Sequence, residues 1–244
     1  MTDCRKIGCV LAVVGLFCAS LFLTIAAQAD TLLTSAVSIT SPSVIDFDAF
    51  GPGITFTSGP VDLGSGVTWS STTTESSIGS GNYFLLSGTD SNGVWDSSLH
   101  YVALGGFPGT MTFTFATPVS AVGAFMNYAP CAVCSDMTID AYDGSTSLGA
   151  FDINLLAPIS TPGGVDAGAF RGISVDSPEI TSFTVSNSAV ILTDLTFSTP
   201  SAGQAPVPEP GTILLFGEGL LGIVALGLND RFRARARYNS RTSY

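Results

Sequence analysis

The chain has 244 residues and a formal net charge of −11, and 45% of its residues are hydrophobic. Segment 30–207 contains Arg171 as its single Lys or Arg, against fifteen aspartates and glutamates. This balance excludes a nucleic-acid-binding function, which needs a basic surface, and it favours the attraction of divalent cations. The same segment is long enough for one domain with its own hydrophobic core.

Residues 1–29 have the pattern of a secretory signal peptide. Two basic residues, Arg5 and Lys6, precede a long apolar run that ends in a small-residue cleavage motif. We therefore expect signal peptidase to process this end and the protein to be secreted. The residues of the predicted cleavage site are Ala27, Ala29 and Asp30, and Asp30 would begin the mature chain.

Segment 30–198 is predicted to be an all-β domain, a single jelly-roll-like β-sandwich, because short strand patterns alternate with turn signals. Alternation is clearest in Met111, Phe113 and Phe115, which would face one side of a sheet. Asp143-Gly144 predicts a tight hairpin turn and Asn92-Gly93 a second one, whereas 70–77 is expected to be a polar loop or exposed edge. The predicted strands are 36–40, 44–47, 54–57, 67–70, 82–87, 100–104, 110–116, 119–128, 137–142, 147–152, 169–175, 180–186 and 190–197.

The second half of this domain resembles the galactose-binding-like jelly rolls. The runs that carry the resemblance are 112–123, 139–144, 170–173 and 192–197. That fold often binds glycans and also serves as plain scaffold, so the resemblance implies a sandwich and not a function.

Cys131 and Cys134 are the only cysteines of the segment that follows the signal peptide. In a cytosolic protein this C-x-x-C spacing would indicate redox chemistry or half of a zinc site. Here the chain is expected to be exported and has no second cysteine pair, so we predict a local disulfide across a turn. Closing so short a loop contributes at most about 2 kcal/mol to stability.

A structural calcium site is one interpretation of Asp46, Asp48 and Asp194. The first two lie near the first strand and the third lies in the last, and in jelly rolls these strands often run close together. Carboxylate oxygens are the ligands that Ca²⁺ prefers. The simpler alternative is that these are solvated edge carboxylates and that the protein has no cofactor.

No catalytic motif is present, and we expect the protein not to be an enzyme. The sequence lacks H-E-x-x-H, G-x-S-x-G and phosphate-binding glycine motifs. Its one histidine, His100, is followed by strand-like residues and is predicted to be a half-buried strand residue rather than a general base. Paired carboxylates for glycoside hydrolysis remain open, because sequence alone does not place acids side by side.

A sugar-binding site would need exposed aromatic side chains next to polar groups. Of the candidates, Trp95 lies in a Gly- and Asp-rich stretch and is the one we expect to be exposed as a ligand-binding residue. Tryptophan and tyrosine in sandwiches also commonly pack in the core or at its rim. The other candidates are Trp69, Tyr83, Tyr101 and Tyr128.

The C-terminal segment 207–237, which follows a linker at 199–206, has three consecutive parts. The motif of Val207, Pro208, Glu209 and Pro210 is held extended by its prolines. Residues 212–228 are apolar and, at ~17 residues, near the short limit for a transmembrane helix. Glu218 lies in the middle and weakens this anchor. The stop-transfer cluster, which keeps the tail cytoplasmic by the positive-inside rule, consists of Arg231, Arg233, Arg235 and Arg237.

These three parts in this order resemble the bacterial PEP-CTERM protein-sorting signal. The resemblance implies that an exosortase-type membrane enzyme cleaves near the motif and passes the protein to the cell surface or exopolysaccharide matrix of a Gram-negative-type bacterium. A non-enzymatic surface or matrix protein is the first hypothesis, with a carbohydrate-binding module and then a secreted glycan hydrolase as alternatives. Related tail segments also occur in some ice-binding proteins, but no Thr-x-Thr array recurs here over successive repeats.

Overall fold

The computed structural model describes residues 30–84, 92–96, 98–106, 108–130, 135–187 and 189–199. The chain divides into two compact units, Met1–Pro200 and Ser201–Tyr244, and every described strand belongs to the first. Within the described residues, no helix has the length and apolar character needed to cross a membrane. The predicted signal peptide, the Cys131–Cys134 disulfide, the sorting motif, segment 212–228 and the arginine cluster lie outside the described residues.

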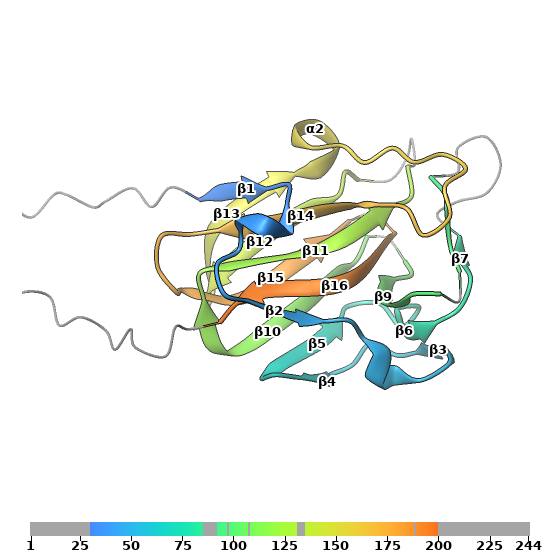
Figure 1. Ribbon diagram of the computed structural model, residues 1–244, viewed down its shortest axis with the longest axis horizontal. Coiled ribbons are helices and arrows are strands. Elements are labelled where there is room, and N and C mark those ends of the chain that lie inside the picture. Colours follow the sequence, from blue (N-terminus) through green and yellow to red (C-terminus); the bar gives the residue numbers. More distant parts are fainter. Residues whose placement is uncertain are drawn as a thin grey trace, which may run out of the picture. The chain divides into compact units, whose positions relative to one another are not determined.

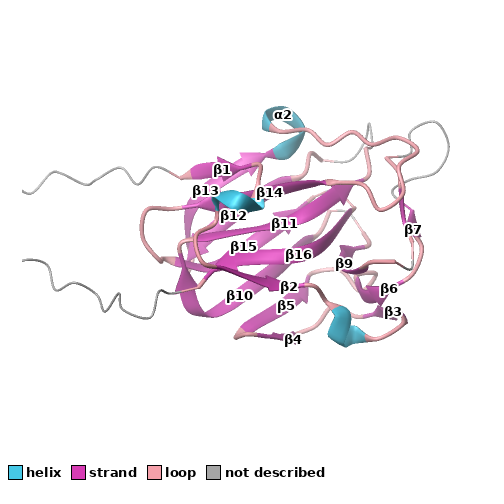
Figure 2. Ribbon diagram, in the orientation of Figure 1, coloured by secondary structure: helices cyan, strands magenta, loops and turns pink. Residues whose placement is uncertain are grey.

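The domain is an all-β sandwich of two antiparallel sheets, which confirms the all-β sandwich part of the prediction (Figures 1 and 2). The larger sheet has the order β1 (Thr31–Leu33), β14 (Ala169–Ser174), β11 (Ala121–Tyr128), β16 (Val190–Ser198), β9 (His100–Leu104), β6 (Ser77–Ser80) and β3 (Gly53–Phe56), and β2 (Pro42–Ile45) also pairs with β16. The smaller sheet has the order β13 (Thr146–Asp152), β12 (Thr138–Asp143), β15 (Ile180–Ser186), β10 (Thr110–Val119), β5 (Val67–Ser71) and β4 (Val61–Gly64). A small ribbon of β7 (Tyr83–Phe84) and β8 (Val94–Trp95) and three short helices, η1 (Ala36–Ser38), η2 (Asp48–Phe50) and α2 (Ile153–Leu156), complete the described elements.

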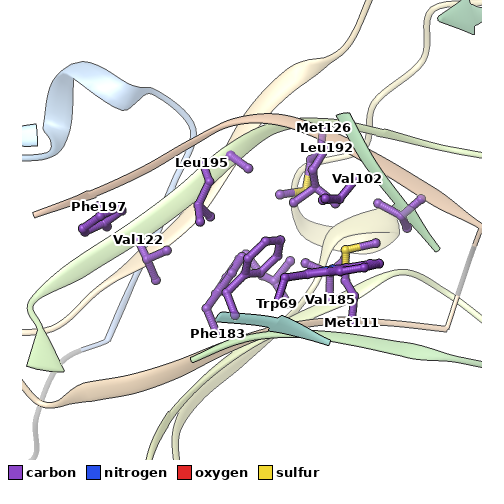
Figure 3. Close-up of a cluster of buried hydrophobic side chains, with 14 of the residues drawn as sticks. Trp69, Val102, Met111, Val122, Met126, Phe183, Val185, Leu192, Leu195 and Phe197 are labelled. Atoms are coloured by element: carbon purple, nitrogen blue, oxygen red, sulfur yellow. The ribbon is translucent and has the colours of Figure 1, made fainter. Parts of the chain in front are cut away.

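The hydrophobic core lies between the two sheets. Met111 and Phe113 of β10 are fully buried, and Phe115 is 6% exposed, as their alternation predicted. Figure 3 shows Trp69, Met111 and Phe183 on one side of this core and Val122, Leu192 and Leu195 on the other. Each such side chain stabilises the fold by roughly 1.5–3 kcal/mol through removal from water.

Most predicted strands are present, and two have the predicted bounds, β9 at His100–Leu104 and β15 at Ile180–Ser186. The predicted strand at 36–40 is wrong, because Ala36–Ser38 form a 3-10 turn. The predicted hairpin at Asp143-Gly144 is confirmed, since Asp143 pairs with Thr146 and Gly144 has a φ of 57°, which glycine adopts without strain.

The expectation of a polar loop or exposed edge over 70–77 is wrong at its C-terminal end. Ser76 and Ser77 are fully buried, and Ser77 begins β6 in the larger sheet. The hydroxyl of Ser76 is hydrogen-bonded to those of Ser71 (2.6 Å) and Thr73 (2.9 Å), which offsets its removal from water. Mutual hydrogen bonds thus account for the burial of Ser76, whereas the buried hydroxyl of Ser77 has no hydrogen-bond partner among the described residues.

Candidate functional site

The three aspartates predicted as metal ligands lie at the junction of β2 and β16. Ile45, the last residue of β2, pairs with Leu195, which places Asp46 next to Asp194. Phe47 then adopts a left-handed conformation (φ 63°) and buries its ring in the core, and Asp48 begins the short helix η2. All three carboxylates stay at the surface as a result.

The electrostatics of this cluster are repulsive. Burial raises the pKa of Asp194, and the negative charges of Asp46 and Asp48 raise it further. Within the described residues, however, no group of three or more His, Cys, Asp or Glu side chains lies close enough together to hold a metal ion. Calcium binding therefore stays a prediction, and it would require the carboxylates to converge.

His100, the first residue of β9, pairs with Asp48 of this cluster. Its Nδ1 lies 2.8 Å from Oδ1 of Asp48, and its side chain is 24% exposed against 70% for Asp48. The prediction of a half-buried strand histidine is confirmed. So exposed a pair contributes little to stability.

The predicted exposure of Trp95 is wrong, because its side chain is fully buried. Strand β8 covers the outer face of the larger sheet, and the indole packs there against Phe125 at a ring-centroid distance of 6.1 Å. Its Nε1 has no hydrogen-bond partner in the described part of the chain. Its buried neighbours form an aromatic cluster outside the main core, which also contains Tyr101, Ala103, Ala129 and Ile191.

Of the other sequence-predicted aromatic candidates, only Tyr83 is partly exposed. Trp69, Tyr101 and Tyr128 are buried. The ring of Tyr83 packs edge-on against that of Tyr101 with centroids 5.7 Å apart. Burial raises the pKa of both phenols to about 12, so both stay protonated at neutral pH.

A buried amide network sits beside the aromatic cluster and explains why Asn92-Gly93 is not the predicted tight hairpin. Asn92 is 3% exposed, and its Nδ2 donates to Oδ1 of Asn127 at 2.7 Å. Nδ2 of Asn127 donates to the carbonyl of Ala167 at 2.6 Å, and the amide of Thr161 donates to Oδ1 of Asn92 at 2.6 Å. The two amides therefore tie segments near residues 92, 127, 161 and 167 together, which is a structural role.

Arg171, the only Lys or Arg between residues 30 and 207, is buried at 8% exposure. Its Nε donates to the carbonyl of Ala157 (2.7 Å). Its terminal nitrogens donate to the carbonyls of Phe170 (2.7 Å) and Pro158 (3.2 Å). Burial lowers its pKa below the ordinary value. The described surface therefore presents carboxylates and hydroxyls but no Lys or Arg side chain.

A hollow of about 280 Å³ lies at one end of the sandwich, near the point where the chain leaves β16. Ser43, Phe115, Thr117, Phe197 and Thr199 contribute to its lining. No Asp, Glu or His lines it, so it offers no acid–base pair for hydrolysis.

One polar cluster was missed by the sequence analysis. Asp140 and Tyr142 project from β12 on the outer face of the smaller sheet, next to Ser147 of β13. The alternation of β12, in which Ile139 and Ala141 face the core, was the available signal. The contact with Ser147 depends on strand pairing and could not be read from spacing.

Comparison of the chain with protein-family models, with curated proteins and with solved structures found no match.

Proposed function

We propose that the protein is an exported, non-enzymatic surface or matrix protein. The signal peptide 1–29 directs export, and an exosortase-type enzyme processes the chain at Val207–Pro210. The observation that carries this proposal is the distribution of positive charge: the sandwich buries its one arginine, and the remaining Lys and Arg residues lie in the two terminal segments. Basic residues at the ends of the chain serve membrane targeting, and an acidic surface favours solubility outside the cell.

The arrangement of the sandwich supports this function. Strand β1 begins and β16 ends at the same end of the domain (Figure 1). A domain attached to a membrane through that end would present its opposite end and both outer faces to its surroundings.

We infer a jelly-roll-like topology from the path of the chain between the sheets. From β9 to β12 the chain passes from the larger sheet to the smaller, back to the larger and again to the smaller. After β13, which pairs with β12 in the smaller sheet, the alternation resumes through β14, β15 and β16. This path supports the resemblance to glycan-binding sandwiches without assigning a ligand.

The sorting motif provides the test. Replacing Pro208, Glu209 and Pro210 by alanines should leave the full-length precursor in the inner membrane, as measured by immunoblotting of membrane and extracellular fractions. Pro206→Ala, just outside the motif, is the matched control and should be processed like the wild type. Normal processing of the triple-alanine variant would refute the sorting role.

A further inference from the structure

The outer face of the smaller sheet carries hydroxyl groups in a two-dimensional array. Side chains opposite the core lie in rows across the strands because neighbouring strands pair residue by residue. One row runs from β4 to β13 through Asp62, Thr68, Thr114, Ser182, Tyr142 and Ser147. The adjacent row contains Ser70, Thr112, Thr184 and Asp140. Neighbours within a row are about 4.8 Å apart and the rows about 6.8 Å apart, which are the spacings of any antiparallel sheet.

Four hydroxyls of this array are available for binding. Thr68 and Thr114 are exposed, and Thr112 and Ser182 are partly exposed. Within the described residues, no side-chain hydrogen bond involves the hydroxyls of these four residues. A free hydroxyl both donates and accepts, so the array can bond a ligand that is itself rich in hydroxyl groups.

Asp140 provides an oriented acceptor within the array. Its side chain is 9% exposed, and its Oδ1 accepts a hydrogen bond from the hydroxyl of Ser147 at 2.8 Å. The neighbouring Asp140 carboxylate raises the pKa of Tyr142, so the phenol stays protonated and can donate a hydrogen bond. An ionised carboxylate has about four lone-pair positions, which leaves acceptor capacity for a pair of ligand hydroxyls.

The ring of Tyr142 supplies the second element that a sugar requires. It is partly exposed and stands beside Asp140, so an apolar ring face lies next to a hydrogen-bond acceptor. A sugar ring has this same combination of an apolar face and a rim of hydroxyls.

We propose that the outer face of the smaller sheet binds a neutral polysaccharide, with Asp140 accepting hydrogen bonds from sugar hydroxyls and Tyr142 packing against a sugar ring. Charge selects this occupant, since the described surface has no Lys or Arg side chain to attract an anionic polymer. The array itself is mostly uncharged, which favours a neutral chain over a polyamine. This inference rests on the proposed matrix function and names its partner.

Affinity electrophoresis tests the proposal with the purified domain 30–199, which contains every described strand and all three hydrophobic clusters of the described residues. Native gels would contain hydroxyethylcellulose, galactomannan or xyloglucan, with alginate as the anionic polymer and chitosan as the cationic one. We expect retardation in at least one neutral polysaccharide and none in alginate.

Variants then locate the binding face. Asp140→Asn should weaken binding at least about tenfold, because a charge-assisted hydrogen bond is lost while the amide oxygen can still accept from Ser147. Tyr142→Ala should also weaken it about tenfold, whereas Tyr142→Phe keeps the ring and should stay within about threefold. Thr112→Glu adds bulk and charge to the array without touching the core and should reduce retardation. Asp194→Asn, in the larger sheet, is the control and should leave retardation unchanged, and urea unfolding checks that each variant is folded.

Several outcomes would overturn the inference. These are no retardation in all three neutral polysaccharides, retardation in chitosan alone, or equal binding by wild type, Asp140→Asn and Tyr142→Ala. Inhibition of ice recrystallisation without polysaccharide binding would assign the array to ordered water, and a dimer abolished by Thr112→Glu would assign the face to a second copy. If the gels show no binding while processing still requires the sorting motif, this inference fails and the proposed function stands. If processing ignores the motif, the proposed function fails whatever the gels show.

Discussion

The two outer faces of the sandwich have opposite surroundings, although both sheets follow the same alternation. In the larger sheet, β16 is buried at every position except Asp194, because the core covers one face and other segments cover much of the other. In the smaller sheet, β10 alternates between buried core residues and the exposed or partly exposed Thr110, Thr112 and Thr114. The covered face therefore contributes to stability, and the open face is free to bind a partner.

Trp95→Ala, on the covered face, should cause the largest loss of stability. It removes the indole from the aromatic cluster and leaves a cavity, so we expect a loss of about 3–5 kcal/mol in the free energy of unfolding. Trp95→Phe should cost much less, because a ring remains and the lost Nε1 had no hydrogen-bond partner among the described residues. Urea unfolding monitored by circular dichroism gives both values.

Thr112→Val is the matched control for this comparison on the open face. It should change the free energy of unfolding by no more than about 0.5 kcal/mol, as is usual for surface substitutions. Similar losses in Trp95→Ala and Thr112→Val would show that the two faces do not differ as described.

The amide network should give the second-largest effect. Asn127→Ala removes the acceptor for the buried amide of Tyr128, whereas Nδ2 of Asn92 loses one acceptor and keeps the carbonyls of Tyr128 and Ile159. An unsatisfied buried donor costs about 1–3 kcal/mol, so we expect a loss in that range or slightly above it by urea unfolding. Ser182→Ala on the open face should be nearly neutral; a comparable loss there would contradict a purely solvent-facing role for that serine.

The sequence predicted the residues that face the main core better than it predicted the surroundings of the opposite residues. Large apolar residues at every second position, as in Met111, Phe113 and Phe115, are sufficient to orient a strand. The same pattern does not say whether another segment covers the outward set. Trp95 appeared exposed because glycine and aspartate surround it in sequence, yet β8 buries it against Phe125.

The candidate sites show the same limit. The nearness of Asp46 and Asp194 followed from the expected proximity of the first and last strands, but the left-handed turn at Phe47 carries no sequence signal of its own. The hydroxyl array escaped notice because it is assembled by pairing between strands and not by a repeat along the chain. Only the pairing of β12 with β13 brings Ser147 to Asp140.

Calcium binding can be tested at Asp194, which is the only exposed residue of β16 in the larger sheet. If the three carboxylates converge on Ca²⁺, then Ca²⁺ at about ten times its dissociation constant should raise the free energy of unfolding by about 1.4 kcal/mol. Chelator should reverse the effect, and differential scanning calorimetry would detect it as a shift in Tm. Unchanged Tm values with Ca²⁺ and with chelator would remove the predicted site.

Asp194→Asn should have the smallest effect, and its sign is opposite to that of the substitutions above. Burial and the charges of Asp46 and Asp48 raise the folded-state pKa of Asp194, so its ionised form destabilises the fold at neutral pH. The asparagine variant should therefore be more stable at pH 7, by less than about 1 kcal/mol because the carboxylate is only partly buried at the surface and solvent screens its charge. This advantage should shrink as the pH falls through the raised pKa and vanish below the ordinary aspartate value, where wild-type Asp194 is protonated in both states. Urea unfolding at several pH values measures the difference. If the asparagine variant were more stable by the same amount at all pH values, packing rather than charge would be responsible. The repulsion among Asp46, Asp48 and Asp194 would then not affect stability.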